Sequence, residues 1–247
     1  MISDVKKIPR KEYRSPNVLQ LKEVKKPEVL AKRFTADWLV PAGLILLSAI
    51  PVIAGAARIA ELTGGAETTP ANARFFASPL PVVSHILSVT LYSILGAFQF
   101  APSFRSRKPG WHRTVGRLLV PCGLVAALSG LWMTQFYPWP EYDGEWLYGL
   151  RLLFGSAMLL SIVLGFAAAR RWDFTRHGAW MIRAYAIGLG AGTQVLTHLP
   201  WFLFPSIQGE LARTLMMAAG WVINLAVAEW IIHKRLTHPK RASSAAA

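Results

Sequence analysis

The sequence is poor in cysteine and in acidic residues, and it lacks the common catalytic motifs of soluble enzymes. Cys122 is the only cysteine, so the chain has no partner for a disulfide within itself. Asp and Glu number 13 against 27 Lys and Arg. We find no cysteine cluster and no HExxH, Walker A or GxSxG motif. Zinc protease, nucleotide-driven and serine hydrolase functions therefore lack their residues.

Long apolar runs are what the sequence has instead. Hydrophobic residues make up 53% of the chain and charged residues only 16%. Six stretches approach or exceed the roughly 20 residues that cross a hydrocarbon core of ~30 Å. Because backbone groups in lipid need internal hydrogen-bond partners, such runs predict helices. The predicted spans are 38–57, 81–102, 116–136, 147–169, 179–202 and 212–232.

These spans predict an all-α, polytopic integral membrane protein with six transmembrane helices in one domain. We place a basic N-terminal tail at 1–34, the membrane domain at 35–236 and a short C-terminal tail at 237–247. The N-terminal tail mixes prolines and charges with few apolar residues. Solvated disorder is one interpretation of this composition, and docking to partner subunits of a membrane complex is the other.

Basic residues gather on alternate connections between the spans. Most of the 27 Lys and Arg lie in the two tails or in the stretches 105–117 and 170–183. This positive-inside pattern predicts a bacterial cytoplasmic membrane protein with both termini in the cytoplasm. The excess charge then serves topology and contact with membrane lipids, and we expect no binding of nucleic acid. The exceptions, on the opposite side, are Arg58, Arg74, Arg151 and Arg213.

Two histidines, His85 and His198, stand inside predicted spans at a similar depth. An ionisable side chain in lipid is costly, so it normally faces the bundle interior and has a partner. Tyr92 and Gln99 share the helical face of His85, and Gln194 precedes His198 by one turn. The pair predicts either a haem iron held between two helices or hydrogen bonds between those helices.

A second histidine pair, His112 and His177, stands at the predicted cytoplasmic ends of the third and fifth spans. Arginines surround it, which suits haem propionates or an anionic donor, while simple anchoring of helix ends is the plainer interpretation. His177 and His198 are about 31 Å apart at 1.5 Å per residue, which is awkward for two closely coupled haems. We therefore expect one haem b, with a second at the His112/His177 pair as an open alternative.

The sequence also resembles a known family. The run HILSVTLYSILGAFQF with the block HRTVGR, followed by HGAWMIRAYAIGLGAGTQ, resembles the predicted membrane protein family called domain of unknown function 2306. That family has no assigned activity to carry over. More distantly, six helices with central histidines are similar to di-haem cytochromes b of the b-561 and ferric-reductase type. This resemblance implies a central four-helix haem core formed by the second to fifth spans.

Two hypotheses on function follow. The first is a b-type cytochrome, or the haem-binding subunit of a membrane oxidoreductase, that passes electrons between a quinol or small donor and an acceptor. His85 and His198 are then the axial ligands. Contacts to the haem or a quinone come from Tyr92, Gln99 and Gln194, and contacts to propionates or an anionic donor from Arg105, Arg113 and Arg183. The second hypothesis is a cofactor-free structural or assembly subunit of a larger membrane complex.

Overall fold

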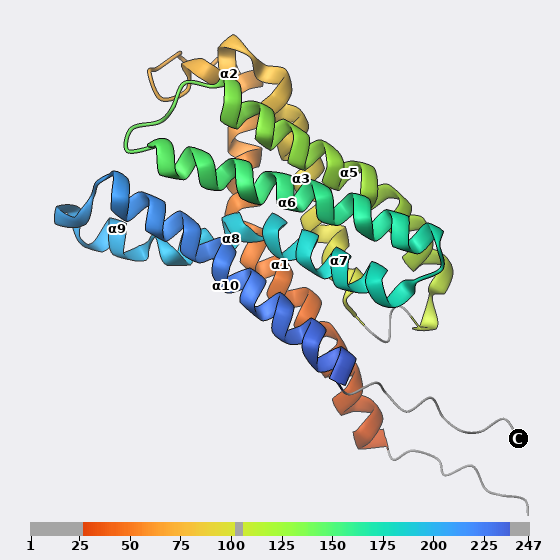
Figure 1. Ribbon diagram of the computed structural model, residues 1–247. Helices are drawn as coiled ribbons and strands as arrows, with labels where there is room; N and C mark the ends of the chain where they lie inside the picture. The colour runs from red at the N-terminus through yellow and green to blue at the C-terminus, as the bar shows by residue number, and fades with distance from the viewer. Residues whose placement is uncertain (1–26, 102–105, 238–247) are drawn as a thin grey trace, which may run out of the picture.

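The computed structural model describes residues 27–101 and 106–237, with side chains from Trp38 onward, and every regular element in these ranges is helical. The long helices are α1 (Pro27–Thr63), α3 (Pro79–Gln99), α5 (Pro109–Phe136), α6 (Glu145–Arg170) and α10 (Glu210–Thr237) (Figure 1). The shorter elements are α2 (Ala73–Ala77), α7 (Phe174–Gly188), α8 (Gly190–Thr197), α9 (Leu199–Leu203) and the 3₁₀ helix η1 (Pro205–Ile207). The all-helical prediction is confirmed for this part of the chain. Most of the predicted N-terminal tail and the predicted ligand Arg105 lie outside the described residues.

Five helices are long and apolar enough to cross a membrane. They are the Trp38–Thr63 part of α1 together with α3, α5, α6 and α10. Each contains most or all of one predicted span, and many large apolar side chains on these helices are exposed. Exposed apolar surface on this scale is what a lipid-facing protein requires, since such patches are rare on soluble monomers.

The remaining predicted span, 179–202, is not one helix. The chain passes through α7, α8 and α9, with breaks at Leu189 and His198. The first break lies in a glycine-rich run. Glycine is about 1 kcal/mol less favourable than alanine in a helix interior, so it weakens the helix at this point. The second precedes Pro200, which cannot donate a backbone hydrogen bond to residue 196. The predicted span at 179–202 is therefore not confirmed as a single helix, because no element of this segment alone is long enough to count as a span.

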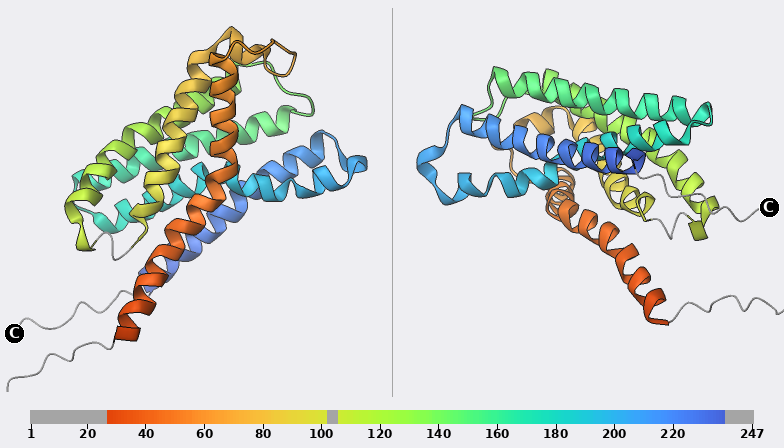
Figure 2. Two further views of the ribbon diagram at one scale, coloured as in Figure 1. Left: turned by 180° about the vertical axis from the view of Figure 1, so that it is seen from behind. Right: turned by 60° about the horizontal axis from the view of Figure 1, so that its bottom comes forward.

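The helices pack as neighbours in chain order. α3 packs mainly on α5, α6 on α7, and α10 on α8 and α7, while the long α1 crosses the back of the bundle against α3 and α8 (Figure 2). The largest buried cluster draws its side chains from α3, α5, α6, α7 and the break at Leu189. Two tyrosines fill its centre, because Gly123 leaves room for the ring of Tyr92 and Gly96 for the ring of Tyr185.

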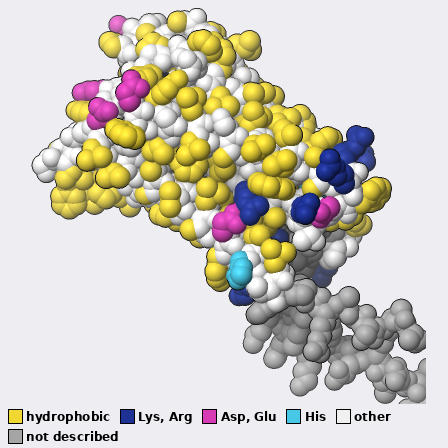
Figure 3. Space-filling view, in the orientation of Figure 1, with side chains coloured by type: hydrophobic (Ala, Val, Ile, Leu, Met, Phe, Trp, Pro, Cys, Tyr) yellow, Lys and Arg dark blue, Asp and Glu magenta, His cyan; other side chains and the backbone are white. Residues whose placement is uncertain are grey.

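The two ends of the bundle differ in charge. We call the end with α2, the 137–144 connection and α9 the cavity end, and the end with the α6–α7 turn and the last turns of α10 the basic end. Figure 3 shows Lys and Arg gathered at the basic end and most of the visible Asp and Glu at the opposite end. The segregation that the sequence predicts is thus present along the long axis of the described bundle.

Candidate functional site

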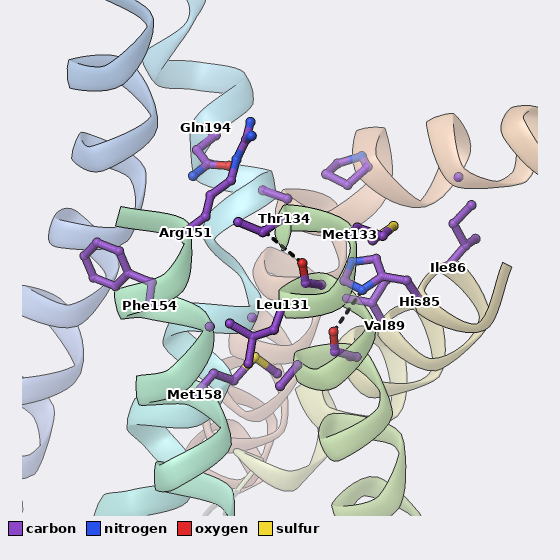
Figure 4. Close-up of a pocket in the computed structure, with 18 of the residues that line it drawn as sticks. His85, Ile86, Val89, Leu131, Met133, Thr134, Arg151, Phe154, Met158 and Gln194 are labelled. Atoms are coloured by element: carbon purple, nitrogen blue, oxygen red, sulfur yellow. Dashed lines mark hydrogen bonds between the residues drawn. The ribbon is translucent and has the colours of Figure 1, made fainter. Parts of the chain in front are cut away.

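A cavity of about 450 Å³ opens at the cavity end and reaches into the middle of the bundle. Its volume falls within the range of about 300–1,000 Å³ that is usual for small-molecule and cofactor sites. Side chains from α1, α2, α3, α5, α6, α10 and the α7–α8 break line it. Figure 4 shows His85, Ile86 and Val89 on one side and Arg151, Phe154 and Met158 on another. Most helices of the bundle therefore contribute side chains to the cavity.

His85 is the one histidine among the residues that line this cavity. Its Nδ1 lies 2.9 Å from the carbonyl oxygen of Ala126 and 3.1 Å from the hydroxyl of Ser129, both on α5. A carbonyl oxygen only accepts, so Nδ1 carries the proton and donates it. In the neutral ring this leaves a lone pair on Nε2, which is the tautomer that a metal-bound histidine has.

The deeper walls are apolar and aromatic. Phe154 of α6 and Trp221 of α10 stack with their ring centroids 4.7 Å apart, and both line the cavity. Gln194 is the polar exception: its Nε2 donates to the carbonyl of Met217 at 3.0 Å, and its stem packs on Gly220. The interior thus offers flat apolar surface with few fixed polar groups, as cofactor pockets usually do.

The rim carries the guanidinium of Arg74, which forms no ion pair with the carboxylates that the structure describes. Arg74 of α2 donates from Nη1 to the carbonyl of Pro138 at 3.2 Å, and its guanidinium carbon lies 4.7 Å from the ring centroid of Phe75. Among the described residues, no Asp or Glu lies within ion-pair distance of Arg74. Burial lowers the pKa of Arg74, and nearby arginines lower it further while Asp143 raises it. It remains protonated at neutral pH.

A second arginine of the lining, Arg151, belongs to a buried charge network. Arg151 of α6 and Arg213 of α10 both pair with Asp143, the second at 2.5 Å between Nε and Oδ1. The side chain of Asp143 is only 2% exposed, and each arginine side chain is 24% exposed. Two guanidiniums, one of which lines the cavity, thus share the carboxylate of Asp143.

A hydrogen bond and an aromatic contact also fix the position of the rim. The hydroxyl of Tyr137 donates to the carbonyl of Ser78 at 2.5 Å, which ties the end of α5 to the start of α3. Burial raises the pKa of Tyr137, so it keeps this donated proton well above neutral pH. The rings of Phe75 and Tyr137 meet edge to face, with centroids 5.6 Å apart. Arg74 therefore projects from a helix, α2, whose position is held by the contact between Phe75 and Tyr137.

The other predicted histidine ligands lie elsewhere. His198 stands at the α8–α9 break, is not part of the cavity lining, and its Nδ1 lies 2.8 Å from the carbonyl of Gln194 in its own turn. His177 joins α7 to α6 through the Gly165 carbonyl, 2.9 Å from Nδ1. His112 lies in the first turns of α5, far along that helix from the lining residues. The structure thus brings neither predicted pair together at this cavity.

The predicted anion-binding arginines also lie away from it. Arg113 is exposed on α5, and Arg183 forms a two-pronged ion pair with Glu229 of α10, at 2.5 and 2.8 Å. Arg183 also lies over the ring of Trp180, 4.7 Å from its centroid. With Glu229 at its edge and Trp180 against one face, Arg183 serves as a clamp between α7 and α10.

Of the predicted polar contacts, only Gln194 lines the cavity. Tyr92 is buried in the core beneath it, with its ring 5.7 Å from that of Tyr185. Gln99 ends α3 at the basic end, and its amide nitrogen is buried. Sequence reasoning missed Arg74, Arg151 and the aromatic wall. The signal for the two arginines was present, because both belong to the few basic residues on the sparsely charged side.

Among the described residues, no three His, Cys, Asp or Glu side chains gather into a group that would hold a metal ion. A haem iron differs from such an ion, because the macrocycle supplies four ligands and the protein one or two. The cavity therefore suits a flat organic group better than a bare metal ion.

The fold and the cavity define a polytopic helical membrane protein with a central cavity. The family described as "Predicted membrane protein (DUF2306)" matches residues 82–232, which is more than half of the chain. The protein belongs to this family of predicted membrane proteins. No curated protein and no solved structure matches the chain, so the more distant resemblance to di-haem cytochromes b gains no support from these comparisons.

Proposed function

We propose that the protein is a membrane b-type cytochrome, or the haem-binding subunit of a membrane oxidoreductase, with His85 as an axial ligand in the central cavity. The observation that carries this proposal is the hydrogen bond from His85 Nδ1 to the Ala126 carbonyl, inside a cavity of about 450 Å³. That bond fixes the ring orientation and leaves Nε2 as the ligating atom.

The residues present fit a haem in their chemical character. His85 offers a nitrogen ligand, and Phe154 with Trp221 offers flat apolar contact for a macrocycle. Bound haem supplies one-electron transfer at its iron. The chain itself holds the ring of His85, lines the inner part of the cavity with apolar side chains, and places guanidiniums at the rim. A quinol or other small donor is the expected source of electrons.

This proposal differs from the original pairing of His85 with His198. Because His198 is not part of the lining, the proposal assigns one protein ligand and leaves His198 as a residue of the α8–α9 break. The central core from α3, α5, α6 and α7 supports a four-helix arrangement around the site, as the haem hypothesis requires.

The test is the visible spectrum of protein purified in detergent from haem-supplied cells. We expect reduced-minus-oxidised bands of a b-type haem in the wild type and their loss in His85→Gly. His177→Ala and His198→Ala serve as controls, since each removes a histidine with a similar backbone hydrogen bond. Both should retain the bands.

A folding defect in His85→Gly would imitate loss of the ligand, so the variant needs its own check. Added imidazole should enter the space left by the side chain and restore the bands, which a misfolded protein would not allow. A wild type that takes up no haem after reconstitution would instead favour the cofactor-free structural or assembly subunit. Full haem content in His85→Gly without imidazole would place the iron elsewhere.

A further inference from the structure

The rim of the cavity carries two guanidiniums, those of Arg74 and Arg151. Asp143, which is not part of the lining, pairs with Arg151 and with Arg213, whereas no ion pair forms between Arg74 and a described carboxylate. Arg58 is nearby, 4.4 Å from the centroid of the Phe75 ring, but it is paired with Glu61. The lining thus contains two arginines and no Asp or Glu, at the mouth of a largely apolar cavity.

Arg74 is the residue best placed to bind an anion at the rim. Its hydrogen bond within the described residues goes to a backbone carbonyl, so most of its five donors are not engaged by other described residues. It lines the cavity, and the Phe75 ring and the Pro138 carbonyl hold it in place. A half-buried arginine of this kind binds carboxylate or phosphate with two parallel hydrogen bonds.

The deeper lining has the opposite character. Val52 of α1, Val89 of α3, Leu131 of α5 and Phe154 of α6 are apolar, and they follow the rim inward. A ligand that satisfies both parts must be an amphiphile, with an anionic head at the rim and an apolar body within. The cavity therefore selects a ligand by the chemical character of its two ends as well as by its size.

We propose that Arg74, assisted by Arg151, binds the anionic head of an amphiphile whose apolar body fills the cavity. The inference rests on the proposed function only for the identity of that body. If haem is the occupant, its propionates lie at Arg74 and Arg151, at the end opposite to the predicted arginines. A fatty acid has the same chemistry of carboxylate and apolar body, and the experiment separates the two sources.

The experiment uses iron-free protoporphyrin IX and its dimethyl ester as probes, with the full chain in detergent. Without iron, binding does not depend on ligation by His85, so the two proposals fail independently. We expect the free acid to bind about tenfold or more tightly than the ester, and Arg74→Gln to remove that preference. Arg58→Gln is the control, because Arg58 contacts the same Phe75 ring but does not line the cavity.

A second pair of probes, oleate and methyl oleate, identifies the body. Preference for the acid in both pairs, with oleate the tighter ligand, supports the inference with a fatty acyl occupant. Preference for protoporphyrin supports it with a tetrapyrrole. Equal affinity for acid and ester in both pairs, or an unchanged preference in Arg74→Gln, would overturn the inference. Loss of binding of the esters as well in Arg74→Gln would show damage to the cavity and also contradict it.

Discussion

At the basic end of the bundle charged side chains are numerous and exposed, whereas at the cavity end a few arginines converge on a buried carboxylate. Arg113, Arg171 and Lys234 at the basic end are all exposed, while Asp143 at the cavity end is 2% exposed. Exposed charges interact weakly through water and act mainly by their number. Buried charges act through their exact partners. A count of charges therefore finds the first end and overlooks the second.

Two histidines, His177 and His85, also differ between the two ends of the bundle. His177 at the basic end and His85 at the cavity share one kind of hydrogen bond, from Nδ1 to a carbonyl of a neighbouring helix. Of these two histidines, His85 lines the cavity and His177 does not. The same local geometry thus serves helix packing in one place and is available for ligation in the other.

The largest effect is expected from removal of the shared carboxylate. Asp143→Ala removes the carboxylate that Arg151 and Arg213 share, and removal of one partner of a buried ion pair typically costs about 3–5 kcal/mol. The measurement is the thermal unfolding midpoint in detergent. Asp173→Ala at the basic end is the comparison: it removes an N-cap bond to the Arg176 amide and should cost about 0.5–2 kcal/mol. Equal losses in the two variants would break the contrast between the ends.

A smaller effect is expected at the glycines. A Cβ at Gly192 would overlap the carbonyl oxygen of Leu47, so Gly192→Ala must push α8 away from α1, at about 1–3 kcal/mol. At Gly116 on α5 a Cβ meets nothing within 4 Å, and Gly116→Ala should be neutral or stabilising by up to about 1 kcal/mol. Unfolding midpoints of the two variants test this. A Gly192→Ala protein as stable as the wild type would mean that α8 and α1 are not packed so closely.

The smallest effect is expected from the clamp between α7 and α10. Arg183 and Glu229 are bonded at two points, but their side chains are 27% and 51% exposed. A double-mutant cycle with Arg183→Gln and Glu229→Gln should give a coupling of about 0.2–1 kcal/mol. Haem content, if present, should not change, because neither residue lines the cavity. A coupling above this range would place the pair in a drier setting than its exposure indicates.

Hydropathy predicts most of the fold because the membrane imposes a length and a composition on each span. Five of the six predicted spans correspond to long helices, and their ends differ by a few residues. The break of 179–202 into three helices was missed, because its apolar composition masks weak helix formers. Glycine at 188, 190 and 192 and proline at 200 were the available signals. Composition thus locates a span more reliably than it shows whether the helix is continuous.

The candidate site was predicted only in part, for a different reason. His85 was recognisable because one ionisable side chain in an apolar run is conspicuous. Its supposed partner His198 was chosen by depth alone, and depth does not say which way a side chain faces. Arg74 and Arg151 lie in separate segments, and only packing of α2, α6 and the 137–144 connection brings them to one rim. Such convergence has no signature in sequence spacing.

The position of iron tests the central claim most directly. The wild-type protein, reconstituted with haem, would be studied by anomalous diffraction at the iron edge, in crystals grown from lipid or detergent. The account predicts a single strong iron peak at bonding distance from His85 Nε2, within the cavity between α3, α5 and α6. An iron peak beside His112 or His177, or a reconstituted protein with no bound iron, would contradict it.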